Sequence, residues 1–129
     1  MTEQKENKPT KSELEILQVL WKEEPLSVRD VNDILNKDRK VGYTTTLKIM
    51  QLMYEKSLLT RKNEGKKHIY FTNVNEQDIQ KNMLDKFLNR TFNGSAYSLV
   101  MEALGNYRAS KEELEAIKQL IEKIEGGQK

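Results

Sequence analysis

The sequence of 129 residues predicts a mostly α-helical protein with one small β-ribbon, on three observations. Apolar residues recur at helical spacing over most of the chain, and a Ser, Thr or Asn stands before each of several such stretches. Two strand-like stretches near the middle flank the turn-forming residues Asn63, Glu64 and Gly65. Between residues 37 and 67, nine basic side chains face three acidic ones, a net charge of +6, whereas the whole chain carries +2. Such a concentration of positive charge is typical of nucleic-acid binding.

The first helix follows a polar tail, residues 1–9, which lacks large apolar side chains other than Met1 and is expected to be disordered. Thr10 and Glu13 have the spacing of a capping box, which predicts that the helix begins there and ends near Lys22. Its apolar face is expected to comprise Leu14, Leu17, Val19, Leu20 and Trp21.

The second helix begins after Pro25, which cannot continue the first. Leu26 is expected to form a short strand that pairs with the later ribbon. Ser27 is an N-cap with Asp30 in the first turn. The buried stripe is expected to comprise Val28, Val31, Ile34 and Leu35, and a polar basic connection follows at residues 36–42.

The third helix, residues 44–57, has two distinct sides when it is laid out at 100° per residue. The side expected to face the core carries Thr46, Ile49, Met50 and Met53. The opposite side carries Thr44, Lys48, Gln51 and Glu55, with Thr45 at its margin. Short hydroxyls, a lysine and an amide suit a DNA major groove, because they hydrogen-bond to bases or phosphates without crowding the helix away. The alternative is the solvated face of an ordinary helix.

The ribbon is predicted from strands at residues 58–62 and 68–72, joined by Asn63, Glu64 and Gly65. A basic hairpin directly after an amphipathic helix is the order of elements in a winged helix, and the two preceding helices would form a helix-turn-helix whose second member reads DNA. Lys62, Lys66 and Lys67 lie near the tip, from which they would reach the phosphate backbone or the minor groove. The alternative is a solubilising loop.

Three further helices are expected after the ribbon. Asn75 caps the first, which runs to about Arg90 and ends at Asn93 and Gly94. Ser95 opens a shorter helix, after which residues 105–107 are expected to form a turn. Ser110 caps the last, and Gly126 and Gly127 stop it.

These helices are too short to enclose a core alone, so we expect their apolar side chains to be buried against a second copy of the chain. A dimer also suits a reader that binds a two-fold symmetric site. The alternative is a monomer in which these three C-terminal helices fold back on the winged-helix domain. The prediction divides the chain into a winged-helix domain at residues 10–74 and a helical dimerisation domain at residues 75–129. The expected dimerisation residues are Met83, Phe87, Leu99, Val100, Leu104, Leu114, Ile117, Leu120, Ile121 and Ile124.

Composition argues against an enzyme. The chain has no cysteine, hence no thiolate nucleophile or thiolate metal site, and no glycine-rich phosphate loop is present. The single histidine, His68, lies among lysines in a predicted strand without metal-ligand spacing. We therefore expect no cofactor and no metal. The absence of a signal peptide or of an apolar run long enough for a bilayer predicts a cytoplasmic protein without membrane contact.

The motifs ELEILQVLW, YTTTLKIMQLMYEKSLLTR, IYF and SAYSLVMEAL together resemble the penicillinase repressor family, the BlaI/MecI/CopY group. The resemblance covers nearly the whole chain after the tail. It implies a winged-helix domain, a helical dimerisation domain and repression at a symmetric operator, with control of a β-lactam-resistance-type or stress operon. The residues that match its DNA contacts are Tyr43, Thr44, Thr45 and Lys48 on the helix and Arg61, Lys62, Lys66 and Lys67 on the wing, to which the helical wheel adds Gln51.

Two departures from that pattern concern the inducing signal. The resemblance to antibiotic-responsive members implies induction by a sensor protease that cuts an Asn–Phe bond. At the matching positions this chain has Glu102 and Ala103. Copper-responsive members carry C-terminal cysteines, which this chain lacks. A second function from another class is a winged-helix interaction module whose basic face docks an acidic protein partner.

Overall fold

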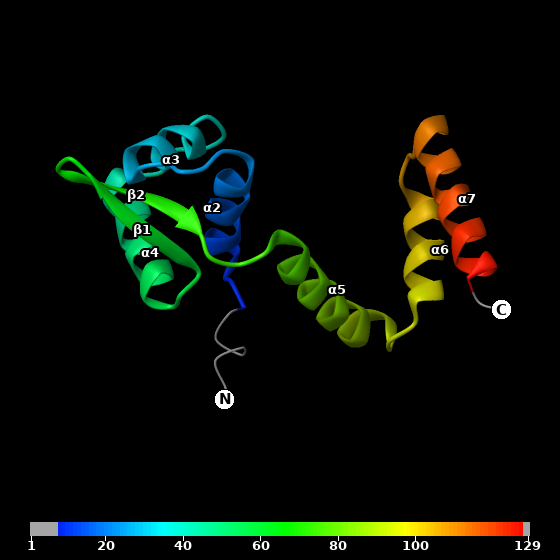
Figure 1. Cartoon of the computed structure of the whole chain (residues 1–129). Helices are drawn as coiled ribbons and strands as arrows, with labels where there is room; N and C mark the ends of the chain where they lie inside the picture. The colour runs from blue at the N-terminus through cyan, green and yellow to red at the C-terminus, as the bar shows by residue number, and fades with distance from the viewer. Residues whose placement is uncertain (1–7, 128–129) are drawn as a thin grey trace. The chain divides into compact units, whose positions relative to one another are not determined.

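The computed structural model describes residues 8–127, which divide into two compact units, one ending at Met83 and the other beginning at Leu84. The elements are α2 (Lys11–Lys22), α3 (Val28–Leu35), α4 (Tyr43–Glu55), β1 (Leu59–Glu64), β2 (Lys67–Thr72), α5 (Glu76–Phe92), α6 (Ala96–Asn106) and α7 (Lys111–Gly126) (Figure 1). The fold class is therefore mostly α with a two-stranded ribbon, as predicted. Of the predicted tail, residues 1–7 lie outside the described residues, and Pro9 is buried.

The predicted starts of α2 and α3 are confirmed. The Thr10 hydroxyl accepts a hydrogen bond from the Glu13 amide at 3.2 Å, and the Glu13 carboxylate accepts one from the Thr10 amide at 2.9 Å. Ser27 and Asp30 form the same reciprocal pair. Each box satisfies amide groups that have no partner inside the helix, so both helices begin where the sequence predicts.

The core of the first unit lies between the three helices and the ribbon. It is mostly apolar, and Thr46 from α4 contributes a fully buried hydroxyl to it. Thr46, Met50 and Met53 are fully buried, which confirms the inward side predicted for this helix. The core comprises Ile16, Leu17, Leu20, Leu26, Val28, Val31, Met50, Met53, Leu58, Leu59 and Tyr70.

The ribbon is an antiparallel hairpin whose strands are longer than expected. Asn63 pairs with His68 and Glu64 with Lys67, so these residues continue the ladder instead of forming the turn. The turn is made by Gly65 and Lys66, and Gly65 has a φ of 65°, which two-residue hairpin turns require and glycine adopts without steric cost. The isolated bridge between Leu26 and Tyr70 confirms the predicted short strand.

The segment after the hairpin is fixed to the first helix by a side chain. The Trp21 indole Nε1 donates a hydrogen bond to the Val74 carbonyl oxygen at 3.2 Å. Asn75 then caps α5, its Oδ1 accepting from the amides of Gln77 and Asp78. The path of the chain from ribbon to α5 therefore depends on α2.

In the second unit, Ser95 and Ser110 cap α6 and α7 as predicted. The predicted turn at residues 105–107 is wrong for its first two residues, because α6 continues to Asn106. The Asn106 amide Nδ2 donates to both the backbone oxygen and the carboxylate of Glu102, which stabilises this last turn. Neither α6 nor α7 buries any residue.

Candidate nucleic-acid interface

The outward side of α4 is exposed and mostly polar, although Leu52, which is 45% exposed, also lies on it. Thr44, Thr45, Lys48 and Gln51 are all exposed, while the side chains on the opposite side lie in the core. Lys48 adds a cation one helical turn after Thr44 and Thr45. The helix therefore offers hydroxyls, an amide and a cation on one convex surface, which is the chemistry that base edges and phosphates accept.

The angle between α3 and α4 is fixed by a buried polar contact. Asn32 on α3 donates from Nδ2 to the Thr46 hydroxyl at 2.8 Å and to the Val41 carbonyl at 3.0 Å. Asn36 donates to the same Val41 carbonyl at 2.8 Å and accepts from the Val41 amide at 3.1 Å. These bonds hold the connection between the helices in one conformation, so the outward side of α4 has a defined direction.

The flank of α4 that faces the ribbon borders a hollow, which we call the wing hollow, with a volume of about 550 Å³. It is bounded by the start of α3, by α4 and by the hairpin. Four of its lining residues are Arg or Lys and one is Asp, so its charge is strongly positive. Its lining residues are Ser27, Val28, Arg29, Asp30, Tyr43, Leu47, Gln51, Arg61, Lys66, Lys67, His68 and Tyr70.

Two arginines are stacked on tyrosines of α4. The Arg29 guanidinium carbon lies 5.0 Å from the centre of the Tyr43 ring, and that of Arg61 lies 4.0 Å from the centre of the Tyr54 ring. A cation over an aromatic face is attracted by the ring and keeps its in-plane N–H donors available. Both guanidinium groups are thus held in place beside the wing hollow.

The predicted DNA-binding residues lie in three places: the wing hollow, the outward side of α4, and the other face of the ribbon, where only Lys62 lies. Tyr43, Gln51, Arg61, Lys66 and Lys67 line the wing hollow. Thr44, Thr45 and Lys48 lie on the outward side of α4.

Lys62 lies on the other face of the ribbon, because it pairs with Ile69 while Arg61 pairs with Tyr70. Its amino group is 5.6 Å from the centre of the Phe71 ring. Arg29, which sequence reasoning missed, joins the wing hollow from α3. Its position two residues after the Ser27 cap was the available signal, since the first turn of α3 lies beside the start of α4.

The start of α4 differs from those of α2, α3 and α7. Its N-cap, Gly42, makes no side-chain hydrogen bond, and the first turn holds no acidic residue. The other three helices begin with capping boxes that contain a carboxylate. The positive end of the α4 dipole therefore stays uncompensated, which favours an approaching anion.

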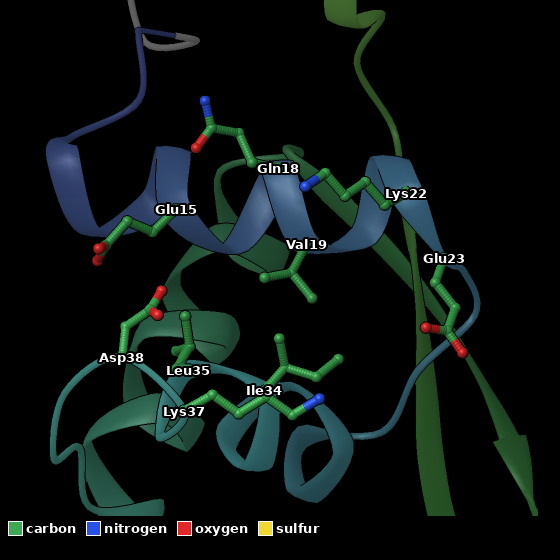
Figure 2. A pocket seen from close by; sticks show the side chains of 9 residues that line it. All are labelled: Glu15, Gln18, Val19, Lys22, Glu23, Ile34, Leu35, Lys37 and Asp38. Atoms are coloured by element: carbon green, nitrogen blue, oxygen red, sulfur yellow. The ribbon is translucent and has the colours of Figure 1, made fainter.

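A different hollow, of about 380 Å³, lies between α2 and the end of α3. Figure 2 shows Val19 pointing toward Ile34 and Leu35 across its floor. Its charged residues are Glu15, Lys22, Glu23, Lys37 and Asp38, so its charge is mixed and slightly negative. Of the two hollows, the wing hollow is the one suited to a polyanion.

The second unit exposes an apolar surface. Large apolar side chains on α5, α6 and α7 remain about half exposed or more, although they recur at helical spacing. Helices α6 and α7 do not cover this apolar surface, since neither of them buries any residue. The exposed residues are Leu84, Phe87, Tyr97, Val100, Met101, Leu104, Tyr107, Leu114, Leu120, Ile121 and Ile124, while Leu99 and Ile117 are half-buried. Met83, the last residue of the first unit, is also half-buried.

Within residues 8–127, no group of three or more His, Cys, Asp or Glu side chains is arranged to hold a metal ion. Over the same residues, no helix combines the length and apolar character that crossing a membrane needs.

A family model described as penicillinase repressor matches residues 9–123. A penicillinase repressor of Bacillus licheniformis is 30% identical over 111 residues, covering 86% of this chain and 87% of the relative. The methicillin resistance regulatory protein MecI of Mammaliicoccus sciuri is 23% identical over 112 residues, covering 87% and 91%. The solution structure of the DNA-binding domain of the repressor BlaI superposes with a TM-score of 0.50 at 26% identity, covering 54% of this chain and 85% of that domain.

Proposed function

Because the chain belongs to the penicillinase repressor family of DNA-binding winged-helix regulators, we propose that it represses transcription as a homodimer bound to a two-fold symmetric operator. The observation that supports the proposal is the wing hollow, where Gln51 of α4 lines the same space as Arg61, Lys66 and Lys67 of the hairpin. In this assignment Thr44, Thr45 and Lys48 contact base edges in the major groove. The basic residues of the hairpin contact phosphates and position the helix.

The homodimer is supported by the second unit. Its helices α6 and α7 bury no residue, yet Leu120, Ile121 and Ile124 lie on one side of α7. Exposed apolar surface of this extent is typical of an interaction site. A second copy is the occupant we propose, because each copy brings the same unsatisfied surface and a two-fold pair of readers matches a symmetric site.

A gel-shift experiment tests the proposal. The full chain is titrated against labelled duplex from the region upstream of its own gene and against random duplex of the same length, at moderate salt. We expect a discrete complex with the upstream duplex at a concentration at least tenfold lower. Equal affinity for both duplexes would contradict the repressor assignment, and recovery of an acidic protein with no DNA preference would favour the interaction module.

Induction by a sensor protease stays a prediction. The bond between Glu102 and Ala103 lies inside α6, where the Glu102 side chain is bound to Asn106. Helical backbone does not fit the extended binding groove of a protease, so a cut at this bond requires local unfolding of α6. Mass spectrometry of the chain recovered from induced cells tests whether this bond is cut.

A further inference from the structure

We propose that the wing hollow holds a phosphodiester group of the DNA strand that passes between α4 and the ribbon, and that Arg29 on α3 binds it. The inference rests on the proposed function and extends it, because it adds a residue outside the helix and the hairpin that sequence reasoning selected. Arg29 would then act as a phosphate-binding residue held in place by Tyr43.

Duplex geometry places a phosphate at this position. In B-form DNA, the backbone of each strand separates the major groove from the minor groove. A helix in the major groove and a ribbon over the neighbouring minor groove therefore straddle one backbone. The space between α4 and the hairpin is the wing hollow, and hollows of about 300–1,000 Å³ accept drug-sized molecules, so a sugar and its phosphate fit within about 550 Å³.

The charges around the wing hollow suit a phosphate. Arg29 lines it from α3, Arg61, Lys66 and Lys67 line it from the hairpin, and Asp30 is the acidic lining residue. The Asp30 carboxylate is turned toward the helix cap, where it accepts from the Ser27 amide at 3.3 Å. Within the described part of the chain, neither Arg29 nor Arg61 forms an ion pair with a carboxylate. Their charges are therefore available to a phosphate.

The stacking on Tyr43 explains why Arg29 is suited to this role. A free arginine side chain loses rotamer entropy when it binds, and that loss weakens the contact. Arg29 already lies 5.0 Å from the centre of the Tyr43 ring, so part of this loss occurs on folding. A guanidinium that lies over a ring still presents N–H donors to its surroundings, which match two phosphate oxygens.

The test compares Arg29→Gln with Arg90→Gln, which removes the same charge from exposed α5. Each full-length variant is titrated with the upstream duplex and with a random duplex over a range of salt concentrations. We expect Arg29→Gln to weaken binding to both duplexes about tenfold at low salt and to reduce the slope of log K against log salt by about 0.9 per subunit. Arg90→Gln is expected to keep the wild-type slope.

Two further variants separate charge from stacking. Arg29→Lys keeps the charge but lacks the flat fork, so we expect the wild-type slope with an intermediate affinity. Tyr43→Leu should weaken binding, and adding it to Arg29→Gln should cost less than it does alone if the ring acts through Arg29. Circular dichroism and thermal unfolding verify that each variant is folded.

The outcomes distinguish the two proposals. A wild-type chain that binds neither duplex would overturn the repressor assignment itself. A wild-type chain that binds, with Arg29→Gln matching Arg90→Gln in affinity and slope, would overturn only the role of Arg29. Effects of Arg29→Gln confined to the upstream duplex would also overturn it, because a phosphate contact carries no base preference.

Discussion

Ser57 is the residue at which the chain leaves α4 for β1, and its backbone is left-handed, with a φ of 68°. The Ser57 amide donates to the Tyr54 carbonyl and the Leu58 amide donates to the Met53 carbonyl, which together form a Schellman motif. Leu58 and Met53, the two residues whose side chains pack in this motif, are both fully buried. The geometry is the one that glycine usually provides at this point, although serine stands here.

Replacing this serine should therefore stabilise the fold. Left-handed backbone costs a residue with a Cβ about 1 kcal/mol, which glycine avoids, while glycine adds some entropy to the unfolded chain. We expect Ser57→Gly to raise the free energy of unfolding by about 0.5 kcal/mol, measured by urea denaturation. Ser57→Ala is the control, and a stabilisation equal to that of Ser57→Gly would show that backbone strain is not the cause.

Glu13 illustrates a residue whose role exceeds its local motif. Its carboxylate caps α2 and also forms an ion pair with the Lys56 ammonium at 2.7 Å, at the end of α4. The Glu13 side chain is only 6% exposed, whereas that of Lys56 is 34% exposed. The pair therefore links the first turn of α2 to the C-cap of α4.

Glu13→Gln keeps an oxygen for the cap but removes the charge opposite Lys56. We expect a loss of about 1–2 kcal/mol in the free energy of unfolding, because the ammonium loses a partly buried partner but still reaches water. Glu15→Gln on the same helix removes the exposed partner of Arg39 and should cost less than about 0.5 kcal/mol. Equal losses in urea denaturation would mean that burial does not set the strength of these pairs.

Residue contacts of this kind could not be predicted from the sequence. Asn32 and Thr46 are separated by 14 positions and Lys56 and Glu13 by 43, so no local spacing indicates that they meet. The pairing of Arg29 with Tyr43 depends in the same way on the angle between two helices. Periodicity gave the direction of each side chain relative to its own helix, but not its partner on another.

At the scale of elements, the helix starts were predictable because caps act locally. Thr10, Ser27, Asn75, Ser95 and Ser110 each bond to amides within three residues. The hairpin turn was misplaced because Asn63, Glu64 and Gly65 all suit turns, and only the pairing register selects Gly65 and Lys66. Helix α6 outlasted its predicted end because a side-chain bond from Asn106 supports its last turn.

The proposed roles of α4, which contacts bases, and of the hairpin, which contacts phosphates, give a prediction at this scale. Thr45 lies on the outward side of α4, whereas Lys67 opens β2 beside the wing hollow. We expect Lys67→Ala to weaken binding to upstream and random duplexes alike, with the salt slope reduced by about 0.9 per subunit. Thr45→Ala should lower mainly the preference for the upstream duplex, by about 1 kcal/mol or more. Identical behaviour of the two variants in salt titrations would contradict the assignment of the groove.

At the scale of the whole molecule, the chain has one unit with a closed core and another whose helices leave their apolar side exposed. We expect Leu120→Asp, which places a charge on that side of α7, to prevent the proposed dimer from forming. A monomer lacks the second winged-helix domain, so its affinity for the proposed operator should fall by about 100-fold or more. Sedimentation velocity and gel shift measure the two effects.

Gln119→Asp is the matched control, because it adds the same charge one position away, on the polar side of α7. It should leave the oligomeric state and the DNA affinity unchanged. A Leu120→Asp variant that sediments like the wild-type chain would contradict the proposed dimer surface.

The contact between Trp21 and Val74 has a practical consequence. Trp21 is the only tryptophan of the chain, and its indole is bonded to the backbone just before α5. Its fluorescence emission therefore reports on the unfolding of the first unit, and helices α6 and α7 contribute no tryptophan signal. A shift in emission that precedes the loss of helical ellipticity would show that the first unit unfolds before the second.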